Sequence, residues 1–218
     1  MSVTPVDAAV ELLGRRKARE NFTGFCEYRL PEEFTMAAHH RLMAAALDRV
    51  ERGETRKLMM MLPPGSAKST YASVLFSEYF LGRNPQLSVI AGAHTAELAE
   101  RFGRRVRNAF TDPVHQMLFN NGVAGDNSSA GRWETDQGGE YYAAGVGTGI
   151  AGFRAKYGLI DDPIRSRQDA DSELIRDRIW DWYINDFRTR LVPGARKVLI
   201  QTRWHEDDLA GRALNHEP

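Results

Sequence analysis

The chain has 218 residues and a formal net charge of zero, with 29 basic and 29 acidic side chains. This length suits one full-sized domain, and a hydrophobic content of 42% with 27% charged residues argues against a disordered or membrane-embedded protein. The charge balance also argues against a protein that binds nucleic acid over its whole surface, although local arginine clusters could still serve one face.

Cysteine and histidine usage limits the chemistry further. Cys26 is the only cysteine, so the chain can form no internal disulfide and no cysteine-based zinc site. His39 and His40 are adjacent, and adjacent helical side chains point about 100° apart, so they do not form a metal-binding pair. The N-terminus lacks the apolar core of an export signal, and the longest apolar runs fall far short of a membrane span. These features predict an intracellular protein.

The order of apolar and polar segments predicts an α/β fold. Residues 1–20 and 35–52 each have the periodicity of an amphipathic helix, and a connector joins them. Short buried strands then alternate with longer helices. Strands are predicted at 57–62, 87–93, 131–135, 140–146, 157–160 and 197–202, and helices at 69–82, 95–110, 171–191 and 205–214. This alternation predicts a mostly parallel central sheet with helices on both faces.

Residues 64–70 are typical of a phosphate-binding loop. Such a loop turns successive backbone N–H groups inward ahead of a helix, and adds a lysine for the phosphates and a hydroxyl for a magnesium ion. Leu62 and Ala67 stand where the usual pattern has glycines. The methyl group of Ala67 is a modest intrusion if φ there is negative, so nucleotide binding and a plain strand-turn-helix both stay open. The candidate nucleotide-binding residues are Pro64, Gly65, Ser66, Ala67, Lys68, Ser69 and Thr70.

Two later strands end in polar residues. Asp161 and Asp162 follow the apolar run at 157–160, and one carboxylate there could hold magnesium while the next orients and deprotonates an attacking water. A helix cap or turn explains the Asp-Asp-Pro sequence as well. Thr202, at the end of the strand at 197–202, could sense a γ-phosphate. The order of loop, acidic strand and polar-ended strand is much rarer by chance than any one of them.

Together these motifs give the chain a specific resemblance. It resembles the N-terminal ATPase half of the large terminase subunits of tailed bacteriophages, the motors that pump DNA into preformed capsids. The resemblance extends from about Arg41 to Arg212, and it implies a P-loop NTPase fold of the ASCE type. It is carried by the segments RKLMMMLPPGSAKSTYASVLFSEYFLGRNP, RWETDQGGEYYAAGVGTGIAGFRAKYGLIDDPI, DADSELIRDRIWDWY and IQTRWHEDDLAGR.

The resemblance implies a role for each motif residue. It makes Lys68 the loop lysine, Ser69 and Asp161 the magnesium ligands, Asp162 the catalytic carboxylate and Thr202 the residue that couples hydrolysis to movement. Many members of the family carry Glu as the catalytic carboxylate. Asp162 is one methylene shorter, so it departs from the pattern. The implied cofactors are ATP and Mg²⁺.

The resemblance also implies an arginine finger from a neighbouring subunit. Arg154, just ahead of the acidic strand, is the main candidate. The rival candidates are Arg203, Arg101, Arg104 and Arg105. Segments ahead of the loop wall the adenine pocket in this family, which makes Tyr28 a candidate for contact with the base.

The resemblance further predicts how the chain is divided. Residues 1–53 are expected to form a helical segment packed on the ATPase core, and residues 54–218 the core itself. Large terminases usually continue into an RNase H-like nuclease domain. We expect that domain, and its nuclease activity, to be absent from this chain.

The implied function is magnesium-dependent ATP hydrolysis coupled to movement of double-stranded DNA into the procapsid. The implied partners are DNA, the small terminase subunit, the portal or procapsid and further copies in a ring, in the host cytoplasm and with no membrane. Two alternatives stay open. A helicase-like ATPase should respond to free single-stranded DNA, whereas a nucleotide-inactive module would only dock procapsid and small terminase, as the altered loop at Ala67 allows.

Overall fold

The structure is a computed structural model that describes residues 4–31 and 33–217. Its helices and strands follow in the order α1 (Pro5–Glu20), α2 (Phe22–Arg29), α3 (Ala38–Glu51), β1 (Lys57–Met61), η1 (Thr70–Leu75), α4 (Phe76–Arg83), β2 (Val89–Ala93), α5 (Ala96–Phe110), α6 (Pro113–Phe119), β3 (Val123–Ser128), β4 (Arg132–Thr135), β5 (Glu140–Gly145), β6 (Ala155–Asp161), α7 (Arg167–Asp171), α8 (Glu173–Trp182), η2 (Tyr183–Phe187), η3 (Arg188–Arg190), β7 (Leu191–Gln201) and α9 (Leu209–His216).

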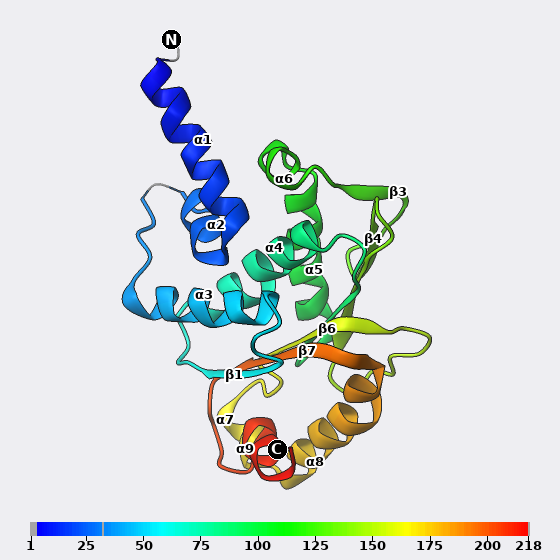
Figure 1. The fold of residues 1–218 in the computed structure, drawn as a ribbon. Coiled ribbons are helices and arrows are strands. Elements are labelled where there is room, and N and C mark those ends of the chain that lie inside the picture. Colours follow the sequence, from blue (N-terminus) through cyan, green and yellow to red (C-terminus); the bar gives the residue numbers. More distant parts are fainter. Residues whose placement is uncertain (1–3, 32, 218) are drawn as a thin grey trace.

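A seven-stranded sheet forms the middle layer of the molecule, in the order β1-β7-β6-β2-β5-β4-β3. The strands from β1 to β5 in that order pair in parallel, and β4 and β3 continue the sheet by antiparallel pairing. Helices α2 to α6 cover one face, and α7, α8 and α9 cover the other (Figure 1). The predicted α/β architecture, with a mostly parallel sheet between two helical layers, is therefore confirmed.

Each helix and strand expected from the sequence has a counterpart in the fold. The expected helix at 1–20 is α1, although residues 1–3 lie outside the described part of the chain, as do Glu32 in the connector and Pro218. Elements α2, α6, α7 and β3 were missed, because segments of five to eight residues carry too little periodicity to stand out. The expected helix at 171–191 is divided: α8 ends at Trp182 and short π and 3₁₀ turns lead into β7.

The sheet is buried on both faces, and each face has its own apolar core. On the upper face in Figure 1, Met60, Tyr157 and Val198 of the strands pack with Phe22 of α2 and Phe76 of α4. Helices α2 and α3 thus share one core with the sheet, as an N-terminal segment packed on it requires. The division at residue 53 stays a prediction.

On the lower face, Ile160 and Leu199 pack with Trp182, Phe187 and Leu209 from the C-terminal helices. Burial on both sides explains why these strands read as continuous apolar runs in the sequence. None of the helices in the described ranges is long and apolar enough to cross a membrane.

The strand order decides where the polar strand ends meet. Strands β1, β7 and β6 are direct neighbours, with Met61 opposite Gln201 and Asp161 opposite Ile200. Parallel strands bring their carboxyl ends to the same edge of a sheet. The loop after β1, the acidic end of β6 and the polar end of β7 therefore lie side by side, although up to 140 residues separate them in sequence.

Candidate active site

The loop that follows β1 makes a tight turn through two left-handed residues. Gly65 has φ of 80° and Ala67 has φ of 58°, after which Ser69 is helical with φ of −69°. The carbonyl of Ala67 accepts the backbone N–H of Tyr71 at 3.1 Å, so the helix begins directly behind the turn. Alternating left- and right-handed residues turn backbone N–H groups toward one concave side, which suits an anion.

The conformation of Ala67 differs from the condition set by the sequence. The sequence requires a negative φ at Ala67 for the methyl group to fit easily. The observed φ is positive, so this requirement is not met. This conformation costs an L-residue roughly 1–2 kcal/mol. Glycine usually takes such positions because it lacks that penalty. The loop therefore holds local backbone strain at Ala67.

Lys68 lies at the centre of the site and is only 6% exposed. Its Nζ lies 2.9 Å from Oδ2 of Asp162 and donates to the Thr202 hydroxyl at 3.0 Å. The backbone N–H of Thr202 donates to Oδ1 of Asp162 at 2.8 Å, and its hydroxyl donates to the carbonyl of Leu62 at 3.2 Å. The structure thus joins the loop lysine, the second carboxylate and the strand-end threonine in one cluster of hydrogen bonds and an ion pair.

Asp161 lies beside this group, deeper in the protein, and is 1% exposed. Burial raises the pKa of its carboxyl to about 6, while hydrogen bonds from Ser73 and Ser69 and the charge of Lys68 act in the opposite direction. One oxygen accepts the Ser73 hydroxyl, whereas Oδ1 has no hydrogen-bond partner among the described residues. A buried carboxylate oxygen without a donor, next to a serine hydroxyl, is the kind of oxygen site that a magnesium ion fits.

Some residues around the site were not anticipated from the sequence. Ser73 lies one helical turn after Ser69, a spacing that could have indicated it. The ring of His40 hydrogen-bonds the backbone of Ser66 and stacks on Tyr71 with ring centroids 4.7 Å apart. Nothing in the local sequence connects His40, on α3, with a loop 26 positions later.

Two of the candidate residues lie away from this group. Tyr28 donates its hydroxyl to Glu11 of α1 at 2.6 Å, and its ring lies beside Gly14. Arg154 precedes β6 and is exposed, with a contact of 3.5 Å to the carbonyl of Thr189. It lies at the amino end of β6, on the order of 20 Å from the carboxylates at the other end of the strand.

The left-handed loop residue gives a stability prediction. Replacing Ala67 with glycine should raise the free energy of unfolding by about 0.5–1 kcal/mol, because relief of roughly 1–2 kcal/mol of backbone strain exceeds the entropy that glycine adds to the unfolded chain. The same change at exposed Ala45 in α3 should lower it by about 0.5–1 kcal/mol. Denaturant unfolding of the two variants measures both; a loss at both positions would show that Ala67 is not strained.

The buried serine pair gives a second prediction. Ser73→Ala removes one of the two serine hydroxyl donors to the buried Asp161 carboxylate and should lower the free energy of unfolding by about 1–3 kcal/mol. Ser77 is a matched control: it lies one turn further, is equally buried, and its hydroxyl has no hydrogen-bond partner in the described part of the chain. Ser77→Ala should therefore be nearly neutral in the same denaturation experiment, and equal losses would contradict the role given to Ser73.

Comparisons with known proteins agree with this architecture. The crystal structure of the HK97 bacteriophage large terminase is similar, with a TM-score of 0.56 at 12% sequence identity, over 92% of this chain and 41% of that chain. This likeness shows the fold alone, a mixed α/β fold with a seven-stranded sheet between helices, and is consistent with a P-loop fold of the ASCE type. This chain spans less than half the length of that terminase. No curated protein sequence matches the chain. The family model described as terminase large subunit, T4likevirus-type, N-terminal, matches residues 59–215, well over half of the chain. The chain therefore belongs to the family of terminase large subunits and carries their N-terminal region.

Proposed function

We propose that this chain is a magnesium-dependent ATPase that drives double-stranded DNA into a viral procapsid. The observation that carries the proposal is the bonded group of Lys68, Asp162 and Thr202, with Asp161 beside it, at the mouth of a phosphate-binding loop. Membership of the terminase family supports the link to DNA packaging.

The loop and its lysine are proposed to bind the phosphates of ATP. The loop residues from Pro64 to Thr70 surround the turn, and the helix behind them adds the positive end of its dipole. Lys68 is already held at this point by Asp162 and Thr202, so its ammonium is oriented before any phosphate arrives. A preoriented charge loses little conformational entropy on binding.

Ser69 and Asp161 are proposed to hold the magnesium ion, which supplies positive charge to the phosphates when it is bound. No group of three or more His, Cys, Asp or Glu side chains suited to a metal occurs within 4–31 and 33–217. Magnesium in nucleotide sites typically takes one or two carboxylates and completes its shell with phosphates and water. The single buried carboxylate of Asp161 beside the hydroxyl of Ser69 fits this type of coordination.

Asp162 is proposed to orient and deprotonate the attacking water, and Thr202 to pass the result to β7. Asp162 is partly exposed, with 27% of its side chain accessible, so water can reach it. Its two oxygens are held by Lys68 and by the backbone of Thr202. Any shift of the Asp162 carboxylate is therefore transmitted directly to the end of β7.

Arg154 is proposed as the finger that completes the site of a neighbouring copy. It lies at the opposite edge of the sheet from its own Asp162, so it can reach only a site on another molecule. The proposed partners are double-stranded DNA, a small terminase subunit, the portal of the procapsid and further copies of this chain in a ring, in the host cytoplasm. Tyr28, bonded to Glu11, remains the proposed contact to adenine.

The first test is ATP binding by Lys68→Ala in the presence of magnesium. Loss of the only lysine in the loop should weaken ATP binding by at least about 100-fold, since charge-assisted bonds to buried groups are worth about 1.5–3 kcal/mol each. Lys17→Ala, on exposed α1, is the control and should bind as the wild type does. If neither the wild type nor either variant binds ATP, the chain is a docking module that uses the P-loop fold as a scaffold.

The second test is turnover by Arg154→Ala over a range of protein concentrations. A finger supplied by a neighbour should contribute at least about 10³-fold to the hydrolysis rate, while ATP affinity stays within a few-fold of wild type. Arg104→Ala on α5 serves as the matched control, because Arg104 is exposed and equally basic. A parallel loss of affinity at Arg154, or a larger loss of rate at Arg104, would argue against the assignment.

A further inference from the structure

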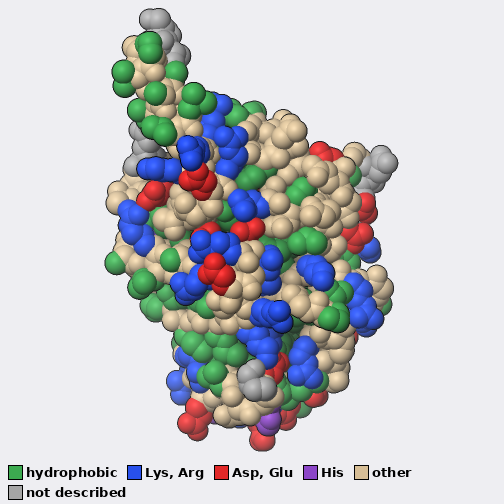
Figure 2. All heavy atoms as spheres, in the orientation of Figure 1, with side chains coloured by type: hydrophobic (Ala, Val, Ile, Leu, Met, Phe, Trp, Pro, Cys, Tyr) green, Lys and Arg blue, Asp and Glu red, His purple; other side chains and the backbone are tan. Residues whose placement is uncertain are grey.

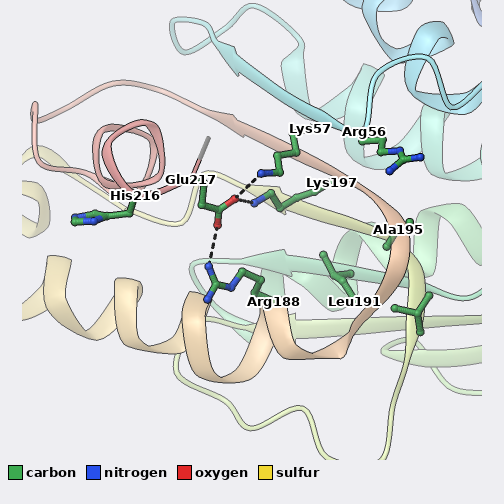
Figure 3. Close-up of a pocket in the computed structure, with 10 residues that line it drawn as sticks. Arg56, Lys57, Arg188, Leu191, Ala195, Lys197, His216 and Glu217 are labelled. Carbon is green, nitrogen blue, oxygen red and sulfur yellow. Dashed lines mark hydrogen bonds and ion pairs between the residues drawn. The ribbon is translucent and has the colours of Figure 1, made fainter.

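A basic pocket lies at the amino end of β1 and β7, at the opposite edge of the sheet from the candidate active site (Figure 3). The cavity has a volume of about 420 Å³ and is open to solvent. We define the basic pocket by its four cations, Arg56, Lys57, Arg188 and Lys197, together with the carboxylate of Glu217. With one acid against four bases, the pocket has a net charge of about +3.

The pocket already holds one oxyanion, the side chain of Glu217. Its Oε2 lies 2.5 Å from Nζ of Lys197 and 3.8 Å from Nζ of Lys57, and its Oε1 lies 3.6 Å from a guanidinium nitrogen of Arg188. The Tyr183 hydroxyl donates to the same carboxylate. Lys197 has only 10% of its side chain exposed, so its ammonium is held in a fixed position within the pocket and not on a free surface side chain. The cations therefore converge on a point where a negative oxygen group sits.

More positive charge surrounds the pocket than the Glu217 carboxylate can balance. Of the four cations that line the pocket, Arg56 pairs with no carboxylate in the described ranges, and the other three share the single carboxylate of Glu217. Figure 2 shows Lys and Arg side chains gathered over the middle of this face, where β7 crosses the front in Figure 1. In a chain with zero net charge, this local excess is a segregated surface.

We propose that the basic pocket binds phosphate groups of a double-stranded DNA backbone. This inference rests on the proposed function, and it names where the ATPase region meets its DNA. Arginine forks suit phosphate oxygens, and a duplex presents one negative charge per roughly 1.7 Å, which an extended basic surface can follow. Glu217 occupies the position of one phosphate and competes with it.

The pocket and the proposed finger use different side chains. The pocket belongs to β1, β7 and η3, whereas Arg154 precedes β6, the next strand in the sheet.

The experiment measures binding of a short DNA duplex by the full chain as a function of salt. The double variant Arg56→Gln with Arg188→Gln should weaken binding by about 10-fold or more and lower the slope of log K against log salt by about 2, one for each lost phosphate contact. Both residues are exposed, so the fold should survive, and a thermal melt checks this. Arg101→Gln with Arg104→Gln on α5 removes the same charge elsewhere and should change affinity less than 3-fold.

Glu217→Gln tests the pocket from the opposite side. Removal of the competing carboxylate should raise DNA affinity a few-fold, and this gain is not expected if Glu217 only stabilises the end of α9. Inorganic phosphate alone is the second arm: if it competes at micromolar concentration, the pocket serves a free anion and the DNA assignment fails.

Other outcomes overturn the inference as clearly. Equal DNA binding by wild type and the pocket variant, or a larger loss in the α5 variant, would place DNA elsewhere. A change in self-association by sedimentation, with DNA binding intact, would make the pocket an interface between copies. ATP binding, measured in parallel, separates the two proposals. If the wild type does not bind ATP, the proposed ATPase function is wrong. If the wild type binds ATP but the pocket variant binds DNA as well as the wild type does, only the assignment of the pocket is wrong.

Discussion

The parallel pairing of β1, β7 and β6 is the constraint on which the rest of the molecule depends. It brings the carboxyl ends of three strands to one edge, so that Lys68, Asp162 and Thr202 bond to one another across sequence separations of up to 134 residues. The amide ladder that fixes the strands also fixes these side chains, because Asp162 donates its own N–H to the carbonyl of Ile200 on β7. The site is therefore as rigid as the sheet that carries it.

Backbone strain is concentrated at this same edge. Ala67 and Asp162 are two of the three residues other than glycine with positive φ in the described ranges, at 58° and 43°. Each such conformation costs roughly 1–3 kcal/mol and persists only where the surroundings enforce it. Here the helix behind the loop and the Lys68–Asp162–Thr202 bonds supply that enforcement.

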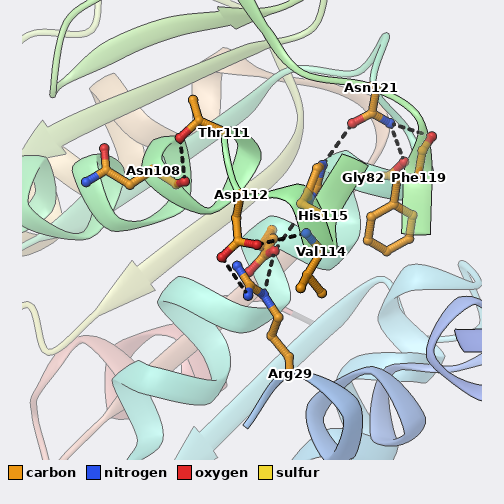
Figure 4. A network of polar contacts seen from close by, with 10 residues as sticks. Arg29, Gly82, Asn108, Thr111, Asp112, Val114, His115, Phe119 and Asn121 are labelled. Atoms are coloured by element: carbon orange, nitrogen blue, oxygen red, sulfur yellow. Dashed lines mark hydrogen bonds and ion pairs between the residues drawn. The ribbon is translucent and has the colours of Figure 1, made fainter. Parts of the chain in front are cut away.

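Polar interactions elsewhere in the fold are mainly internal supports. In Figure 4, Arg29 at the end of α2 pairs with Glu78 of α4 and with Asp112 ahead of α6, at 3.1 Å each. Buried His115 continues the network from Glu78 to Asn121. This network ties the N-terminal helices to the upper layer, and both of its carboxylates pair with Arg29. The basic pocket at the amino edge differs because its cations outnumber their carboxylates.

The sequence by itself determined the fold class, the position of the loop and the two polar strand ends, because each depends on local patterns of apolar runs and turn residues. It did not reveal α2, α6, α7 and β3, which are too short for periodicity to show. The sign of φ at Ala67, the donor from Ser73 to Asp161 and the contact of His40 with the loop were decided only by the tertiary structure. The same holds for the pocket around Glu217, whose cations come from β1, β7 and η3. Contacts between distant segments depend on how strands are ordered in the sheet, and no local pattern encodes that order.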